Sequence, residues 1–308
     1  TYNQNDEKVI EETFQVDYSH PLGKSKSIDK NSNDNEKNNF SNKAKGKKWR
    51  GKKSNSNKIE LGVKIINRDR EMVYSNQLNN IYKSSEKFDY NQHVISSYIS
   101  TEISMKKGFG LKTGVRYENT QSSGNWKNNS ESPFKNNYGN LLPSFVISKS
   151  FSPMRSIKFS YNQRIRRPGV RNINTNENFD DSRNFTVGNP QLKPTRSEQY
   201  EFTLNSFGKI LQGSTQLYYK HSNDVIESFL DTIQNGSSIS TYKNIGETRQ
   251  LGISFFGSMR LNKLTLRGSF DLYNYSGKDI SLGYEEWTES VVLYSYYFGG
   301  SYNLGKNW

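Results

Sequence analysis

The chain has 308 residues, of which only 31% are hydrophobic, yet 13% are aromatic and the formal net charge is +13. The low hydrophobic content argues against two ordinary soluble domains, and the aromatic content argues against a disordered chain. No run approaches the roughly 20 apolar residues of a spanning helix, and the absence of cysteine excludes disulfides and thiol chemistry. The class that remains is a β-rich protein with one modest apolar face.

Apolar and polar residues alternate along most of the chain. Leu111, Val115 and Tyr117, for example, fall on one face of an extended segment, and Lys112 and Arg116 fall on the other. A period of two residues predicts half-buried β-strands. The predicted strands are 8–19, 58–75, 88–105, 109–120, 139–151, 155–167, 197–208, 211–230, 239–261, 263–276 and 287–304, and a twelfth is predicted to begin near Lys306.

The connections between these strands alternate between short and long. The long ones are expected near residues 77–87, 121–138, 168–196, 231–238 and 277–286. Long strands with one apolar and one polar face, joined in this way, are typical of outer-membrane β-barrels. We therefore expect a lumen-facing set (Arg116, Lys158, Arg164, Arg267 and Asp271) and a lipid-facing set (Val115, Ile157, Phe159, Leu266 and Phe270). A soluble β-sandwich also alternates and is the alternative, but strands well beyond 5–6 residues favour the barrel.

A basic segment interrupts this pattern. Residues 24–58 contain twelve Lys or Arg and three Asp or Glu, a net charge of 12 − 3 = +9. This Lys-, Asn- and Ser-rich segment cannot bury enough apolar surface to offset its ordering entropy, so we predict a disordered insert at 24–57 within one barrel domain, 1–308. An arm that binds nucleic acid or anionic lipid is the alternative. Because base stacking needs aromatic platforms and only Phe40 and Trp49 are present, we expect no nucleic-acid partner.

Several motifs occur in a fixed order. Residues 161–168 (YNQRIRRP) precede 188–194 (GNPQLKP) and 197–202 (SEQYEF). This run resembles "Y..R..RP … GNP.L.PE.S..YE" in the barrels of TonB-dependent outer-membrane receptors, especially the Bacteroidetes-type outer-membrane β-barrel family. Further similar segments, from about residue 9 onward, are DYSHP, GVRYE, LLPS and NIG. The chain departs from the family at Ile173-Asn174-Thr175, where "LNP" is usual, and at Thr195, where Glu is common.

The resemblance implies an all-β, antiparallel transmembrane β-barrel in the outer membrane of a Gram-negative bacterium, with about 11–12 strands of a 22-stranded barrel in this chain. It implies uptake of a bulky ligand (a chelate, an oligosaccharide or a peptide). The implied partners are outer-membrane lipid, a TonB-type energising complex, and a surface lipoprotein or other complex subunits. Family transport requires a plug and a TonB box, and these residues contain neither. A structural or interaction barrel without transport is the alternative, and a soluble β-rich protein with an anion-binding arm is a third.

Ligand contacts are expected in the long loops, because binding residues concentrate on loops held by a rigid scaffold. The predicted ligand-binding residues are Trp126, Arg166, Arg167, Arg171, Phe179, Asp180, Arg183 and Trp287. Pro168, Pro190, Pro194 and Gly188 are better explained as loop architecture, with a direct ligand role as the alternative. The three histidines are isolated and no catalytic or nucleotide-binding motif occurs, so we expect no enzymatic activity, cofactor or metal site.

Overall fold

A computed structural model of the protein describes residues 2–22, 57–78, 82–127, 132–175, 184–234, 237–279 and 287–305. The strands are β1 (Tyr2–Pro21), β2 (Lys58–Leu78), β3 (Tyr82–Ser104), β4 (Phe109–Lys127), β5 (Phe134–Ser152), β6 (Arg155–Arg166), β7 (Asn184–Thr186), β8 (Thr195–Phe207), β9 (Leu211–Gln234), β10 (Ser237–Leu261), β11 (Leu264–Asp279) and β12 (Val291–Tyr302). Two short helices, η1 (Lys106–Gly108) and α1 (Val170–Ile173), lie between strands. No helix in the described segments is long and apolar enough to cross a membrane.

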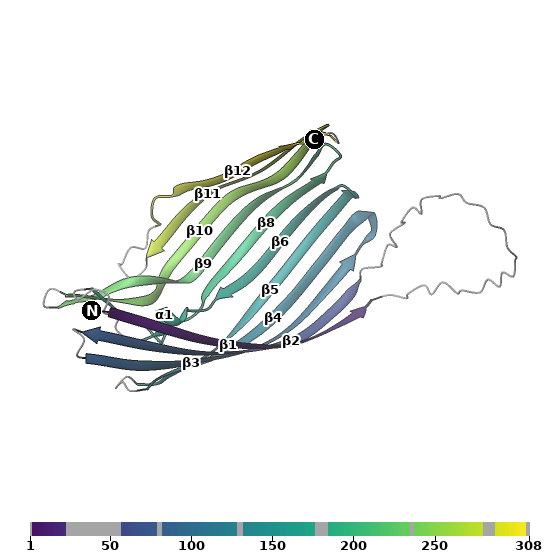
Figure 1. Cartoon of the computed structure of the whole chain (residues 1–308). Coiled ribbons are helices and arrows are strands. Elements are labelled where there is room, and N and C mark those ends of the chain that lie inside the picture. The colour runs from purple at the N-terminus through teal and green to yellow at the C-terminus, as the bar shows by residue number, and fades with distance from the viewer. Residues whose placement is uncertain are drawn as a thin grey trace, which may run out of the picture.

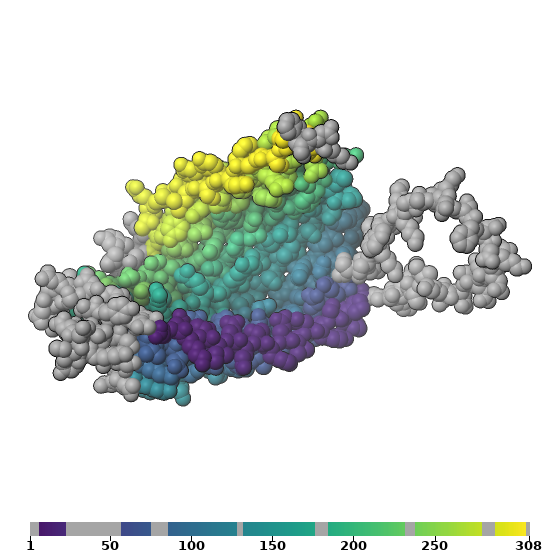
Figure 2. Space-filling view, viewed as in Figure 1, coloured from purple at the N-terminus to yellow at the C-terminus, as the bar shows by residue number. Residues whose placement is uncertain are grey.

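All strands except β7 lie side by side in chain order in one curved sheet (Figure 1). Every neighbouring pair on this path is antiparallel. The short strand β7 lies off the path and pairs in parallel with β10. The predicted antiparallel all-β fold and its eleven complete strands are confirmed, and the strand predicted near Lys306 lies outside the described residues. Figure 2 shows the two end strands, β1 in purple and β12 in yellow, on opposite margins of the sheet.

One face of the sheet is apolar and exposed. Tyr18, Leu61 and Ile99 are successive cross-strand partners at one side of the sheet, and Phe255 and Phe270 are partners at the other. Each of these side chains is at least 40% exposed. Large apolar side chains in such numbers need a lipid environment, and we call this surface the apolar face.

The alternate residues form the polar face. Tyr98 donates a hydrogen bond to Asp17 across the sheet (2.5 Å), and the Arg116 guanidinium lies 5.5 Å from the centre of the Tyr98 ring. Near the other margin, Tyr218 donates to Asp271 (3.4 Å). The register assigns the predicted lumen-facing and lipid-facing residues to opposite faces, as the alternation indicated.

The apolar face forms a belt of limited height. On β4 it runs from Phe109 to Tyr117, about nine residues, or about 30 Å of strand. At a strand tilt of about 40° this is about 23 Å across the membrane, close to the ~25 Å apolar band of outer-membrane barrels. Tyr161, Tyr200 and Tyr219 mark one border, with ring centres 4.9 Å and 6.3 Å apart along the row. Such a row is typical of the aromatic girdle at a membrane interface.

The two ends of the sheet carry different connections. Short turns at 105–108, 153–154, 208–210 and 262–263 lie at one end, which we call the short-turn end. Pro21 and Lys58 are paired at this same end, so the connection that contains the predicted basic insert begins and ends there. In outer-membrane barrels the short turns are periplasmic. The opposite end, toward the long connections, is called the long-loop end.

Several predicted boundaries need correction. The predicted loop 77–87 is shorter, because β2 continues to Leu78 and β3 begins at Tyr82. The predicted loop 231–238 is shorter too, because β9 continues to Gln234 and β10 begins at Ser237.

β4 continues to Lys127 and β5 begins at Phe134, so the predicted loop 121–138 is much shorter. Beyond the belt the outward residues of β4 are polar, so the alternation that reveals a strand is lost although the pairing continues. The last predicted strand begins at Val291 instead of 287.

Candidate functional site

The chain between β6 and β8 folds back onto the polar face at the long-loop end. Its described parts, 167–175 and 184–194, are called the strap. The strap contacts strands β2, β4 and β5 on one side and β10 on the other. It includes α1, which lies within the curve of the sheet in Figure 1. A segment attached to both sides in this way narrows the space in front of the polar face.

An apolar cluster holds the strap down. Ile173 and Leu192 of the strap are only 2% and 3% exposed. They belong to one buried cluster with Phe88 and Trp126, whose ring centres are 4.7 Å apart. Full burial of one such side chain contributes about 1.5–3 kcal/mol. The cluster therefore gives the strap a small core of its own, completed by Met72, Tyr90 and Val170.

Polar contacts fix the strap to the β2–β4 side. The Trp126 indole N–H donates to the Thr175 hydroxyl (3.0 Å), and the Asn174 amide donates to the Tyr74 hydroxyl (2.7 Å). Tyr74 lies beyond the apolar belt, and burial raises the pKa of its hydroxyl. The hydroxyl therefore stays neutral at physiological pH.

Backbone contacts fix the strap to the β10 side. The Asn189 side-chain amide donates to the Tyr242 carbonyl (2.9 Å). Asn244 makes two bonds to Lys193: its oxygen accepts from the backbone N–H (2.8 Å) and its amide donates to the carbonyl (2.9 Å). These bonds satisfy backbone groups of a segment that has few regular ladder partners.

Gly188 allows the two parts of the strap to meet. Its N–H donates to the Asn174 carbonyl (2.8 Å). A Cβ at this position would lie 2.2 Å from the Asn174 oxygen and 2.5 Å from its nitrogen. No other residue fits without moving the backbone, which explains the glycine of the GNP motif in physical terms.

Arg167 anchors the strap to β4. Its Nε donates to the Thr120 hydroxyl (3.0 Å), and its Nη2 donates to the Glu118 carboxylate. Arg116 lies on the other side of Glu118, with 3.5 Å between Nη1 and Oε1. The Glu118 side chain is 12% exposed and that of Arg167 is 21% exposed. The second arginine of the RRP motif is thus engaged in a largely buried ion pair.

The other predicted arginines have a different environment. Arg166 and Arg171 are exposed, and among the described residues no carboxylate lies within ion-pairing distance of either. Arg166 is the last residue of β6 and lies on its polar face, and Arg171 lies in α1. Both guanidinium groups can therefore reach a ligand near the strap. The predictions at Phe179, Asp180 and Arg183 lie outside the described residues.

The two predicted tryptophans lie apart. Trp126 is in β4, not in a loop, and at 6% exposure it belongs to the apolar cluster. Trp287 stacks with Arg249, whose guanidinium carbon lies 3.7 Å from its ring centre, and approaches His221. Arg249 and His221 continue the outward-facing series of β9 and β10. The structure therefore does not bring Trp287 together with the strap.

Several residues of this region could not be singled out from the sequence. Glu118 and Asn244 are ordinary polar residues of predicted strands, and only the fold shows that they hold the strap. Glu118 is the last residue of the motif GVRYE and Asn244 is the first residue of NIG, and these motifs are the sequence signal that points to them. In the described residues no group of three or more His, Asp or Glu is arranged to hold a metal ion.

The whole chain, residues 1–308, matches the outer membrane protein beta-barrel family. The chain belongs to this family. Membership agrees with the antiparallel sheet, the apolar belt and the predicted location in the outer membrane of a Gram-negative bacterium. Among proteins of curated function, none matches the chain.

Solved structures with the same fold include outer-membrane receptors. A structure of the FpvAI–pyocin S2 complex matches 99% of this chain and 38% of that chain at 11% identity, with a TM-score of 0.61. The copper transporter OprC matches 81% of this chain and 40% of its own at 16% identity (TM-score 0.60). The alcaligin outer-membrane receptor FauA of Bordetella pertussis matches 99% and 45% at 13% identity (TM-score 0.57). This family member thus spans less than half the length of each, and at these identities the likeness establishes the fold.

Proposed function

We propose that this family member forms part of the wall of a TonB-dependent receptor that takes up a bulky ligand across the outer membrane. The observation that carries the proposal is the strap. A lumen narrowed by a packed segment suits a gated receptor for a large ligand better than an open diffusion pore. Similar structures named as a copper transporter and an alcaligin receptor support this assignment.

The ligand class follows from the surface around the strap. Arg166 and Arg171 provide exposed cations near the strap, and Arg164 is a third exposed cation on the same face of β6. Guanidinium groups bind carboxylates and phosphates in a fixed two-pronged geometry. A chelate, an oligosaccharide or a peptide that carries anionic groups fits this surface. The motif order further supports a receptor of the Bacteroidetes type, with a TonB-type energising complex and a surface lipoprotein as its proposed partners.

Genetics in the source bacterium tests the proposal. Strains that lack the gene, the TonB-type energising protein or both are grown on limiting chelated metal, oligosaccharide or peptide. We expect the strain without the gene to grow poorly on one of these nutrients. Because both proteins act in one step, the strain that lacks both should grow no worse there than the strain that lacks the energising protein alone. Additive defects, or a defect confined to surface assembly with normal uptake, would instead indicate the structural barrel.

A matched pair of variants tests the ligand surface. Once a nutrient is found, Arg166→Gln with Arg171→Gln should raise the ligand Kd about tenfold or more, since each charge-assisted bond contributes about 1.5–3 kcal/mol. The control is Lys193→Gln, an exposed cation on the other side of the strap. Equal affinity of the wild type and the double variant, with both correctly inserted, would remove these arginines from the binding surface.

A further inference from the structure

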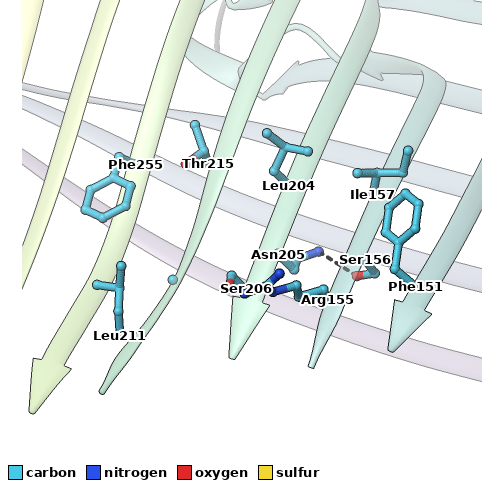
Figure 3. Close-up of a pocket in the computed structure, with 11 residues that line it drawn as sticks. Phe151, Arg155, Ser156, Ile157, Leu204, Asn205, Ser206, Leu211, Thr215 and Phe255 are labelled. Atoms are coloured by element: carbon cyan, nitrogen blue, oxygen red, sulfur yellow. Dashed lines mark hydrogen bonds between the residues drawn. The ribbon is translucent and has the colours of Figure 1, made fainter. Parts of the chain in front are cut away.

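A groove of about 320 Å³ lies on the apolar face near the short-turn end (Figure 3). Ile157, Leu204, Thr215 and Phe255 cross it as successive partners on β6, β8, β9 and β10. Thr215 is much smaller than Leu204 and Phe255 on either side, and the next outward position on β9 is Gly213. Thr215, together with the adjoining row of small residues Ser206, Gly213 and Gly257, therefore leaves a depression in the belt.

Basic residues border this groove where the belt ends. Arg155 lines the groove, and Lys209 lies in the adjoining turn between β8 and β9. Among the described residues no carboxylate lies within ion-pairing distance of either side chain. Both side chains are exposed, so neither charge is committed to a partner within these segments.

The same charge pattern extends along the short-turn end. The four short turns with their flanking residues (104–109, 151–156, 207–211 and 260–264) contain Lys106, Lys107, Arg155, Lys209, Arg260 and Lys263. They contain no Asp or Glu. A rim that carries basic residues and no acidic ones attracts the anionic headgroups of lipids at a membrane surface. The groove is the place where such a rim meets a depression suited to hydrocarbon.

We infer that this groove is a binding site for an anionic phospholipid of the periplasmic leaflet. One acyl chain lies over Thr215 and Gly213 between Leu204 and Phe255. The phosphate lies at Arg155, whose planar guanidinium matches phosphate geometry, and Lys209 adds a second charge. The groove has room for a section of one acyl chain. Free phosphate would have no reason to prefer a site with an apolar floor.

Native mass spectrometry of the full-length protein, released from detergent, tests the site with phosphatidylglycerol and phosphatidylcholine as probes. The wild type should retain one phosphatidylglycerol at least fivefold more tightly than phosphatidylcholine. Arg155→Gln with Lys209→Gln should remove that preference, and Thr215→Trp, which fills the depression, should weaken both lipids about tenfold. Thr215→Leu is a milder version, and the heat-dependent mobility shift of folded barrels confirms assembly of every variant.

Two variants outside the groove serve as controls. Lys106→Gln removes a cation from another short turn, and Thr113→Trp enlarges an exposed threonine on the same face of β4. Both should bind like the wild type. Lipid retention that is unchanged in the groove variants, or reduced equally by the controls, would overturn the inference. A dimer that binds no lipid at the groove and that Thr215→Trp disrupts would also overturn it, because a second copy of the chain would then cover the groove.

Discussion

Replacement of Arg167 with Gln tests how the strap is held on the polar face. The guanidinium donates to Glu118 and Thr120, and the Glu118 side chain is only 12% exposed. Loss of the cation leaves a largely buried carboxylate whose remaining basic neighbour is Arg116, 3.5 Å away. Removal of one partner of a buried ion pair costs about 3–5 kcal/mol. Because Arg116 remains and Arg167 is 21% exposed, we expect about 2–3 kcal/mol against the docked strap.

Hydrogen exchange of the full-length protein in detergent micelles measures this change. Since 1.4 kcal/mol is a factor of ten, the amide of Gly188, bonded to the Asn174 carbonyl, should exchange about 30- to 140-fold faster. Arg166→Gln, one residue earlier, is the matched control and should leave the exchange rate unchanged.

A second substitution separates charge from shape. Adding Glu118→Gln to Arg167→Gln removes the unpaired charge, so the double variant should recover most of the lost protection. Unchanged exchange in Arg167→Gln, or an equal increase in Arg166→Gln, would refute the assignment of Arg167 as the anchor of the strap.

Three further outcomes are expected. Gly188→Ala should release the strap and expose it to protease while the sheet still assembles, because its Cβ has no space at 2.2 Å from a backbone oxygen. Phe270→Arg should lose about 2–4 kcal/mol of barrel stability in a bilayer refolding assay, because Phe270 faces lipid. Ser269→Arg should lose none, because Ser269 faces the lumen, and equal folding of both variants would contradict this assignment of the two faces. Cysteines at Ser54 and Ser182 should label on opposite sides of the membrane in intact cells, with surface labelling at Ser182 only; surface labelling at Ser54 would reverse the orientation.

The strands could be predicted because their signal is local. Within the belt, lipid on one side and water on the other impose a two-residue period that any stretch of ten residues displays. Beyond the belt the outward residues of β4 are polar, so no alternation marks the strand although it continues to Lys127. The sheet order also follows from the sequence, because neighbouring strands in such barrels are consecutive in the chain.

The strap could not be predicted because its partners are distant in sequence. Trp126 and Thr175 are 49 residues apart, and Tyr74 and Asn174 are 100 residues apart. The motif RRP contains two adjacent arginines that the sequence does not distinguish. Only the fold shows that Arg167 is paired with Glu118 while its neighbour is exposed.

One face of this sheet meets lipid and the other meets water, and spin labels along a single strand test this directly. Because these 308 residues contain no cysteine, single cysteines at positions 265–272 of β11 can carry nitroxide labels in the full-length protein in bilayers. We expect collisions with oxygen to peak at the even positions, which face lipid, and collisions with a water-soluble nickel complex to peak at the odd ones, which face water. Uniform access of the nickel complex to both sets, as in a soluble sheet, would contradict it.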